Sequence, residues 1–329
     1  MAAFIFFAGT KNLGFKQVLI IPVEHQKSCH DSHNPFPLSI TGYHDKLYMT
    51  DFHNKRIKHL SIRHYLNLKE KEFRIQNIDI VITYIISIVI LRPTNRDNIM
   101  RVGLLETYLK NADNDYLPGE DVYFVHILEE ETERQLLLPR SSLHLPEISE
   151  GSNQMSGSLL ELSTRDLLVG VFHVNTIYRI SNGHFIEPFL LGDSNKMKFQ
   201  SMSLIESEQQ ELIACSFSNK SVVFYALKFN KLDPVKIISF DFTPFKLLWM
   251  PSLEVLFVFN LKESNSIAAI MTESLEKMHE IQCETSIEVR DCCLLQMVAG
   301  DPIESISIID NKTKSLGVYM LLINFDTAQ

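Results

Sequence analysis

The sequence lacks the short motifs that mark most catalytic sites, and it has little glycine. No Gly-x-Ser-x-Gly elbow, glycine-rich phosphate loop, His-Glu-x-x-His helix or Cys-x-x-Cys pair occurs among the 329 residues, and only 12 of them are glycine. The sequence therefore offers no signature of a nucleophile-elbow hydrolase, a P-loop protein or a zinc protease. This favours a non-catalytic protein and leaves an enzyme with scattered site residues as the alternative.

Cysteine is also scarce, and its spacing indicates neither disulfides nor a zinc site. The number of cysteines is odd, and they are Cys29, Cys215, Cys283, Cys292 and Cys293. We expect reduced, mostly buried thiols in a cytoplasmic or nuclear protein. The apolar segment 1–8 is short for a signal sequence and has no basic residues before it, so we interpret it as an edge strand.

The chain has no strong basic patch. Its formal net charge is −9, and a phosphate-binding surface needs a basic field, so we expect no nucleic-acid partner. Lys55, Arg56, Lys58 and Arg63 form the densest basic group. We interpret this group as the solvated face of a strand.

No apolar run is long enough to cross a membrane as a helix. The most hydrophobic segment, Ile78–Leu91, has 14 residues with Asp79 inside it, whereas a spanning helix needs about 20 apolar residues. Seven of the 14 residues are isoleucine, which favours strand. We therefore predict one buried strand, or two strands back to back, and no membrane partner.

What the sequence does contain is a recurring two-stranded pattern. The stretch 47–62 reads as a strand, a polar turn and a second strand, which is typical of a hairpin. Its apolar skeleton is Leu47, Phe52, Ile57 and Leu60. Two copies with unchanged spacing are Leu167, Phe172, Ile177, Ile180 and Leu212, Phe217, Val222, Tyr225, and a looser copy is Leu253, Phe259, Ile267, Ile270.

The spacing of the phenylalanines predicts a ring of blades. They lie at positions 52, 172, 217 and 259, so the steps are 120, 45 and 42 residues. If 120 is three periods, every step agrees with a repeat of about 40 to 45 residues, the length of a four-stranded propeller blade. Further repeats are then expected near the apolar segments Ile85–Leu91, Val122–Leu128 and Leu294–Val298.

We therefore predict an all-β β-propeller of six to seven four-stranded blades, with residues 1–329 as one domain. A sheet with two apolar faces cannot bury both by itself, so neighbouring blades must cover one another. Two apolar segments, 4–8 and 17–23, could complete a blade that begins at the C-terminus.

One copy of the pattern has a family resemblance. Leu47–Ile57, with the sequence Leu-Tyr-Met-Thr-Asp-Phe-His-Asn-Lys-Arg-Ile, resembles the NHL-type repeat, which combines an apolar strand, an Asp, a turn Asn and Arg-Ile. The resemblance covers this single repeat and implies a β-propeller. The WD-type signature is absent, because the single tryptophan, Trp249, is not part of a Trp-Asp pair.

Two segments depart from the blade pattern. In 94–121, apolar residues recur near helical spacing and an acidic loop, 113–121, follows, so we predict a helical and loop insertion. Residues 139–158 are rich in Ser, Pro and Gly, and we predict a long loop there. Between them, residues 122–128 and 136–138 are expected to form a hairpin with an acidic tip at 129–135.

Three groups of residues have the composition of metal ligands, and each also has a plainer interpretation. The cluster His25, Cys29, His30 and His33 suits zinc or is a loop rich in histidine. The acidic loop 113–121 suits calcium or is a solvated turn, because its spacing is not that of an EF-hand. His53 and His173 share a repeat position and are either a ligand pair or exposed turn residues.

The function that this pattern favours is a non-catalytic protein–protein interaction platform in which one face of the propeller docks a partner within a larger complex. The acidic loops, 113–121 and 129–133, would suit a basic partner surface or serve solubility. The first alternative is a calcium- or zinc-dependent hydrolase of the lactonase or esterase propeller type. Such a site would need ligands at equivalent blade positions, yet Asp51 aligns with Val171 and Ser216.

A second alternative is an extracellular receptor-type propeller, for which Asn219 and Asn311 are glycosylation sequons. We assign no catalytic, cofactor-binding or metal-binding residue from the sequence and expect no cofactor.

Overall fold

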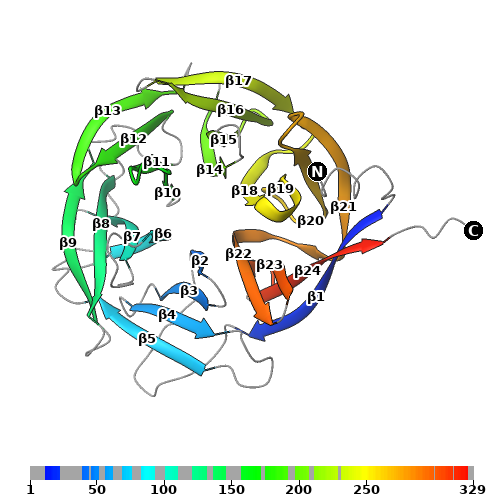
Figure 1. Cartoon of the computed structure of the whole chain (residues 1–329), viewed down its shortest axis with the longest axis horizontal. Helices are drawn as coiled ribbons and strands as arrows, with labels where there is room; N and C mark the ends of the chain where they lie inside the picture. The colour runs from blue at the N-terminus through cyan, green and yellow to red at the C-terminus, as the bar shows by residue number, and fades with distance from the viewer. Residues whose placement is uncertain are drawn as a thin grey trace, which may run out of the picture.

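The computed structural model describes residues 12–22, 39–43, 46–51, 56–61, 69–75, 83–92, 101–109, 121–131, 136–145, 157–171, 175–191, 197–206, 211–228, 231–299, 301–313 and 315–324. Within these ranges there are 24 β-strands and one short 3-10 helix, η1 (Pro251–Leu253). The strands form antiparallel blades arranged in a ring around a central axis (Figure 1). The fold is an all-β β-propeller, as predicted.

Five blades consist of four strands that are consecutive in the chain. Blade 1 contains β2 (Ile40–Tyr43), β3 (Lys46–Asp51), β4 (Arg56–Ser61) and β5 (Lys69–Ile75). Blade 2 contains β6 (Thr83–Leu91), β7 (Arg101–Leu109), β8 (Asp121–Glu131) and β9 (Leu136–His144). Blade 3 contains β10 (Gly157–Glu161), β11 (Leu167–Val171), β12 (Thr176–Ser181) and β13 (His184–Leu190). Blade 4 contains β14 (Phe199–Glu206), β15 (Glu211–Phe217), β16 (Ser221–Lys228) and β17 (Lys231–Ser239). Blade 5 contains β18 (Pro244–Met250), β19 (Val255–Asn260), β20 (Ser264–Met271) and β21 (Glu276–Ile287).

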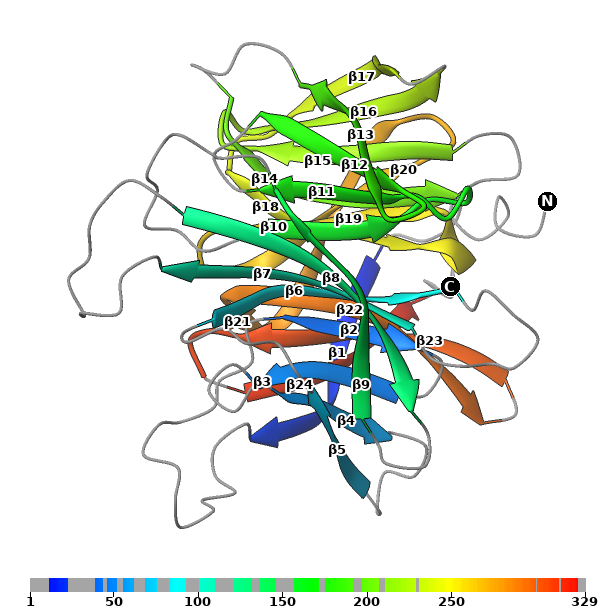
Figure 2. The same cartoon turned by 90° about the vertical axis from the view of Figure 1, so that its left-hand side faces the viewer.

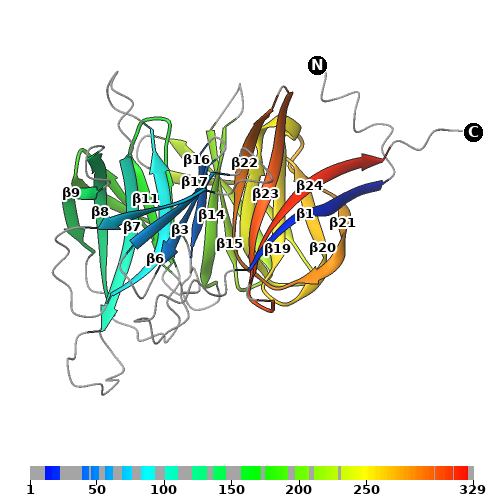
Figure 3. The same ribbon diagram turned by 90° about the horizontal axis from the view of Figure 1, so that it is seen from below.

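A closing blade joins the two ends of the chain. Its first three strands are β22 (Val289–Ala299), β23 (Asp301–Asp310) and β24 (Ser315–Asn324), and its fourth is β1 (Asn12–Pro22). β1 pairs antiparallel with β24, from Asn12 opposite Asn324 to Pro22 opposite Ser315. Figure 3 shows these two strands side by side. This pairing confirms the predicted closure for the second apolar segment, whereas residues 4–8 lie outside the described ranges.

The first strand of each blade lies nearest the axis and the fourth lies at the rim, as Figure 1 shows. Figure 2 views the ring from the side, with blade 4 at the top and blade 1 at the bottom. At two places neighbouring rim strands pair in parallel, β1 with β21 and β5 with β9, and each pair merges two blades into an eight-stranded sheet. The other two sheets have four strands each and end at β13 and β17.

Hydrophobic residues fill the seams between the blades. Of the six buried clusters in the described residues, each combines side chains from two neighbouring blades. The seam between blades 4 and 5, for example, contains Phe224 and Trp249. This arrangement confirms that each blade covers the apolar face of the next, which is how so many β-branched strands are removed from water.

The repeated apolar skeleton belongs to the second and third strands of the blades. Leu47, Leu167 and Leu212 are buried on β3, β11 and β15. Their partners Ile57, Ile177 and Val222 are buried on β4, β12 and β16. The pattern is therefore confirmed as one hairpin used at equivalent blade positions. Phe217 and Phe259 are buried near the ends of β15 and β19, while residues 52 and 172 lie outside the described ranges.

The described chain has fewer blades than the upper end of the number predicted from the spacing of the phenylalanines. The segments at 85–91 and 122–128, which were expected in two blades, are β6 and β8 of the same blade. The step of 120 residues therefore spans two blades, because blade 2 and its connections are long. Five blades of consecutive strands and the closing blade account for all described strands, so a seventh blade is wrong for this part of the chain.

The predicted helix is also wrong. Residues 101–109 form β7, which pairs along its whole length with β8. Both faces of the strand are covered, because Val102, Leu104 and Leu105 are all fully buried. A strand that is apolar on both faces does not alternate, and here its apolar residues coincide with helical spacing. The predicted loop 139–158 is partly strand as well, since β9 extends to His144 and β10 begins at Gly157.

The most hydrophobic segment is a strand at the axis. β6 takes up its residues 83–91, with Ile88 and Leu91 buried, which confirms the predicted strand. Among the described residues, none forms a helix that is long and apolar enough to cross a membrane. The hairpin of β8 and β9 is confirmed, although both strands are longer than predicted.

Candidate functional site

Polar side chains link the blades to one another around the axis. Each blade contributes one such side chain, and each bonds to the next blade along the ring. We call this set the inner belt, and its members are Ser39, Ser87, Ser158, Ser216, Lys246 and Asp291. Ser39 directly precedes β2, and Ser216 lies on β15 beside the inner strand β14.

Four links of the belt are made by serine hydroxyls. The Ser39 Oγ accepts from the Ile88 N–H at 3.3 Å, and the Ser87 Oγ accepts from the Leu159 N–H at 3.2 Å. The Ser216 hydroxyl lies 3.2 Å from the Phe245 carbonyl oxygen, to which it can donate. The Ser158 hydroxyl lies 3.5 Å from the Met202 carbonyl oxygen and is the longest link. These bonds join blades 1 to 5 in order.

Asp291 completes the ring from the closing blade. Its Oδ2 accepts from the Ser39 hydroxyl at 2.7 Å and from the Ile40 N–H at 3.0 Å. Its Oδ1 accepts from the Cys292 N–H at 3.0 Å and lies 3.0 Å from the Lys246 Nζ on blade 5. The side chains of Lys246 and Asp291 are only 15% and 10% exposed. One carboxylate therefore connects three blades.

The chemistry available at Asp291 is limited because its oxygens are fully occupied. A carboxylate accepts about four hydrogen bonds, and Asp291 has four donors within 3.0 Å. Three of these four donors belong to blades 1 and 5, so the carboxylate is engaged mainly in bonds between blades. At the neighbouring Cys292, burial and the charge of Asp291 raise the pKa of the thiol above its usual value.

A second polar group lies where three inner strands end. The Arg92 N–H, just after β6, donates to Glu161 Oε2 at 2.7 Å, and the Arg92 guanidinium pairs with Glu206 at the end of β14. Burial raises the pKa of the Glu161 carboxyl, although its contacts with Arg92 oppose the shift. The group joins blades 2, 3 and 4 on the side where the inner strands end.

The described cysteines are free thiols in the apolar seams. Cys215 and Cys293 are buried, and burial raises the pKa of each thiol well above the usual value. Burial also raises the pKa of Cys283 to about 12. All four described cysteines are free; Cys215, Cys283 and Cys293 are buried and Cys292 is half-buried, which confirms mostly buried thiols for this part of the chain.

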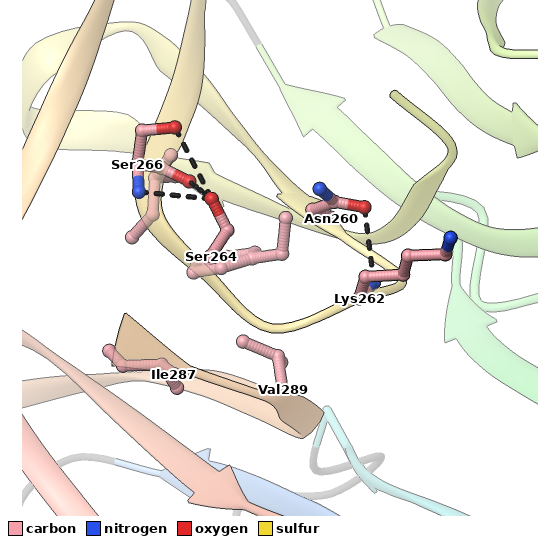
Figure 4. Close-up of a pocket in the computed structure, with 8 residues that line it drawn as sticks. Asn260, Lys262, Ser264, Ser266, Ile287 and Val289 are labelled. Carbon is pink, nitrogen blue, oxygen red and sulfur yellow. Dashed lines mark hydrogen bonds between the residues drawn. The ribbon is translucent and has the colours of Figure 1, made fainter. Parts of the chain in front are cut away.

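The pocket in Figure 4 is too small for a substrate. It lies between the β19–β20 turn and the start of β22, and its volume of about 10 Å³ leaves room for about one water molecule. Two of its backbone N–H groups are already bonded: the Ser266 N–H donates to Ser264 Oγ, and the Lys262 N–H donates to Asn260 Oδ1.

Most of the residues that the sequence marked as metal ligands cannot be placed. The described ranges do not include the histidine cluster at 25–33, His53, His173 or residues 113–120. Within those ranges, no group of three or more His, Cys, Asp or Glu side chains could hold a metal ion. Of the aligned positions 51, 171 and 216, Ser216 belongs to the inner belt and Val171 is buried in a seam.

The two sequons lie in turns. The Asn219 Oδ1 accepts from the Ser221 hydroxyl at 2.6 Å, and the Asn311 Nδ2 donates to Glu288 Oε1 at 2.8 Å. The inner belt itself was missed by the sequence reasoning. Its signal is a small or charged polar residue within the apolar inner strands, such as Ser87 among isoleucines, and such residues stand out only when the strand order is known.

The ring of four-stranded blades places this chain among the β-propellers. One similar solved structure is Saccharomyces cerevisiae Sqt1, with a TM-score of 0.55 and 10% identity over 94% of this chain and 100% of that chain. A second is Staphylococcus aureus virginiamycin B lyase, with a TM-score of 0.52 and 12% identity over 94% of this chain and 100% of that chain. A third is Chaetomium thermophilum Raptor, with a TM-score of 0.54 and 9% identity over 98% of this chain and 30% of that chain. No protein-family profile and no curated protein sequence matches the chain. Similarity at these identities shows the fold alone.

Proposed function

We propose that this chain is a non-catalytic protein–protein interaction platform. In this proposal, residues 1–329 act as one propeller domain that docks a protein partner within a larger complex in the cytoplasm or nucleus. The NHL-type likeness of residues 47–57 contributes to the fold assignment and adds nothing about the partner.

The state of the polar groups near the axis supports a non-catalytic role. An active site needs groups that can bind substrate or exchange protons. The inner belt instead uses its polar atoms to hold blades together, and the oxygens of Asp291 are saturated. These contacts explain the buried charges without any substrate.

Exposed apolar side chains at the rim carry the proposal. Leu190 at the end of β13 is 78% exposed, and Ile237 and Val235 on β17 are 61% and 50% exposed. When a partner covers such side chains, their removal from water lowers the free energy of the complex by roughly 25 cal/mol per Å² of apolar surface. The rim of blades 3 and 4 is therefore the surface on which we expect docking.

The predicted preference for a basic partner stays a prediction. Of the acidic residues on which it depends, Asp121 and residues 129–131 are on β8, and Glu129 pairs with Arg101 at 3.5 Å. The remaining residues of 113–121 and 129–133 lie outside the described ranges.

The test is quantitative affinity purification with the intact chain and a triple variant, Leu190→Thr, Val235→Thr and Ile237→Thr. Threonine keeps a high strand propensity but removes apolar surface. We expect a stoichiometric protein partner with the wild type and at least a tenfold loss with the variant. A metal analysis of the same preparation provides the contrast, because stoichiometric calcium or zinc without a partner would support the hydrolase and contradict the platform.

A further inference from the structure

The rim strand β17 presents an unpaired edge. Its sheet has the order β14-β15-β16-β17, so within the described part of the chain β17 pairs on one side only. The rim strands β5 and β9 pair with each other, as do β1 and β21. An unpaired edge carries a row of free N–H and C=O groups and is a template for another strand.

Most side chains of β17 are exposed to solvent. Seven of its nine residues are exposed, and Val235 and Ile237 are among them. The pairing with β16 shifts between Phe224 and Tyr225, so Val235 is the extra residue of a bulge next to Pro234. Because proline lacks an N–H, the ladder available to a new strand lies after it, at residues 235–239.

The charge of this edge is opposite to that of the whole protein. The segment 228–239 contains Lys228, Lys231 and Lys236 against a single Asp233, whereas the chain as a whole has a net charge of −9. All four of these side chains are exposed. A partner strand with alternating acidic and apolar residues would match both the lysines and the apolar pair.

We propose that the edge of β17 binds an extended acidic segment of a partner protein, which adds a fifth strand to blade 4 by β-augmentation. The acidic side chains of that segment lie near Lys231 and Lys236, and its apolar side chains cover Val235 and Ile237. This inference rests on the proposed platform function and names one of its surfaces. A second copy of the chain fits poorly, since it would bring the same excess of lysines to the edge.

The test uses three labelled, end-capped peptides and fluorescence anisotropy. The first alternates glutamate and valine, the second alternates lysine and valine, and the third is the acidic peptide with N-methyl groups on alternate residues, which blocks half of the ladder. The wild-type protein should bind the acidic peptide at least tenfold more tightly than either control peptide. Equal binding of the acidic and basic peptides, or of the methylated one, would overturn the inference.

Variants of the protein supply the matched controls. Lys231→Glu with Lys236→Glu should weaken binding of the acidic peptide at least tenfold, while Lys262→Glu, on the exposed β19–β20 turn, should leave it unchanged. Ile237→Thr should weaken binding several-fold. An unchanged affinity in the double variant would overturn the inference. It would also be overturned if the wild-type protein sedimented as a dimer and the double variant as a monomer, because the edge would then bind a second copy of the chain.

The two proposals fail in different ways. If a stoichiometric partner is recovered and still binds the variant with Lys231→Glu and Lys236→Glu, the platform function stands and the β17 edge is not its surface. If neither the acidic peptide nor any stoichiometric partner binds, the platform function fails together with this inference.

Discussion

The Nζ atom of Lys246 lies 3.0 Å from Oδ1 of Asp291, and this contact joins blade 5 to the closing blade. The same carboxylate accepts hydrogen bonds from the Ser39 hydroxyl and the Ile40 N–H of blade 1. The first and last segments of the ring therefore meet at one side chain, and its removal should affect the entire closure.

Replacement of Asp291 by alanine should strongly destabilise the fold. It leaves the Lys246 ammonium and two donors of blade 1 buried without their acceptor, and breaking a buried charge pair costs about 3 to 5 kcal/mol. Urea unfolding followed by the fluorescence of Trp249, the single tryptophan, measures the loss. Lys246→Met is the control and should cost less, because Asp291 keeps three donors. A loss below about 1 kcal/mol for Asp291→Ala would contradict the role of the belt.

Gly42 should tolerate no side chain. A Cβ atom there would lie 1.8 Å from the Leu294 carbonyl oxygen of the closing blade, and backbone cannot easily move. Gly42→Ala should therefore cost about 3 kcal/mol or more in the free energy of unfolding. Gly170→Ala meets the ring of Phe199 at 2.4 Å, which has more freedom to shift, so we expect a smaller loss. The reverse order of the two urea midpoints would contradict this account of the seams.

Glu161→Gln should be neutral or stabilising at pH 7. Burial raises the pKa of Glu161 above 4.5, so the folded state binds the proton more tightly than the unfolded chain does. The stability from this group is present below that value and is lost as the pH rises through the folded pKa. Glutamine is neutral throughout and can still accept from Arg92. Urea midpoints at pH 4 and pH 7 test this, and a variant that loses stability only at pH 7 would contradict it.

Asp166 should show the opposite dependence on pH. Burial opposes ionisation of its carboxyl, but hydrogen bonds from Ser181, Arg179 and Thr164 outweigh this and lower its pKa below 3.8. Its contribution is present above that value and is lost as the pH falls through the folded pKa. Asp166→Asn should therefore destabilise at pH 7, with a difference that shrinks below about pH 4.

A double-mutant cycle separates this pair from other acid effects. The Arg179 Nε donates to Asp166 Oδ2 at 2.8 Å, and a hydrogen bond to a charged group is worth about 1.5 to 3 kcal/mol. Arg179→Met combined with Asp166→Asn should reveal a coupling of that size at pH 7. Strictly additive losses would show that the two side chains stabilise the blade independently.

Deletion of residues 1–23 should open the closing blade. β24 then loses its antiparallel partner along ten residue pairs, and β21 loses its parallel neighbour. We expect a lower melting temperature and concentration-dependent aggregation, because the free edge of β24 becomes available to other chains. A synthetic peptide of residues 12–22 should restore the melting temperature, and a scrambled peptide should not. Equal melting of the intact and shortened proteins would contradict the closure.

The sequence predicted the architecture because burial leaves a periodic trace. Leu167 and Ile177 are conspicuous since both strands that carry them are covered on both sides by neighbouring blades. The same burial misled the prediction of a helix around residues 101–109, where Val102 and Leu105 are apolar for two different seams. Periodicity cannot distinguish a fully buried strand from a helix when no turn residue marks its ends.

The polar belt could not be predicted in the same way. Ser39 and Asp291 are 252 positions apart in the sequence, and nothing near either of them indicates the other. Their bond depends on which blades become neighbours when the ring closes. The exposed edge of β17 was equally hidden, because a rim strand with lysines and a proline reads locally as a loop.

The pairing of β1 with β24 imposes an order on biosynthesis. Residues 12–22 leave the ribosome long before their partner exists, and during that interval the apolar run Val18, Leu19, Ile20 and Ile21 has no native strand to pair with. The nascent chain must therefore keep this run from aggregating, by itself or with a chaperone, until translation has produced residue 324.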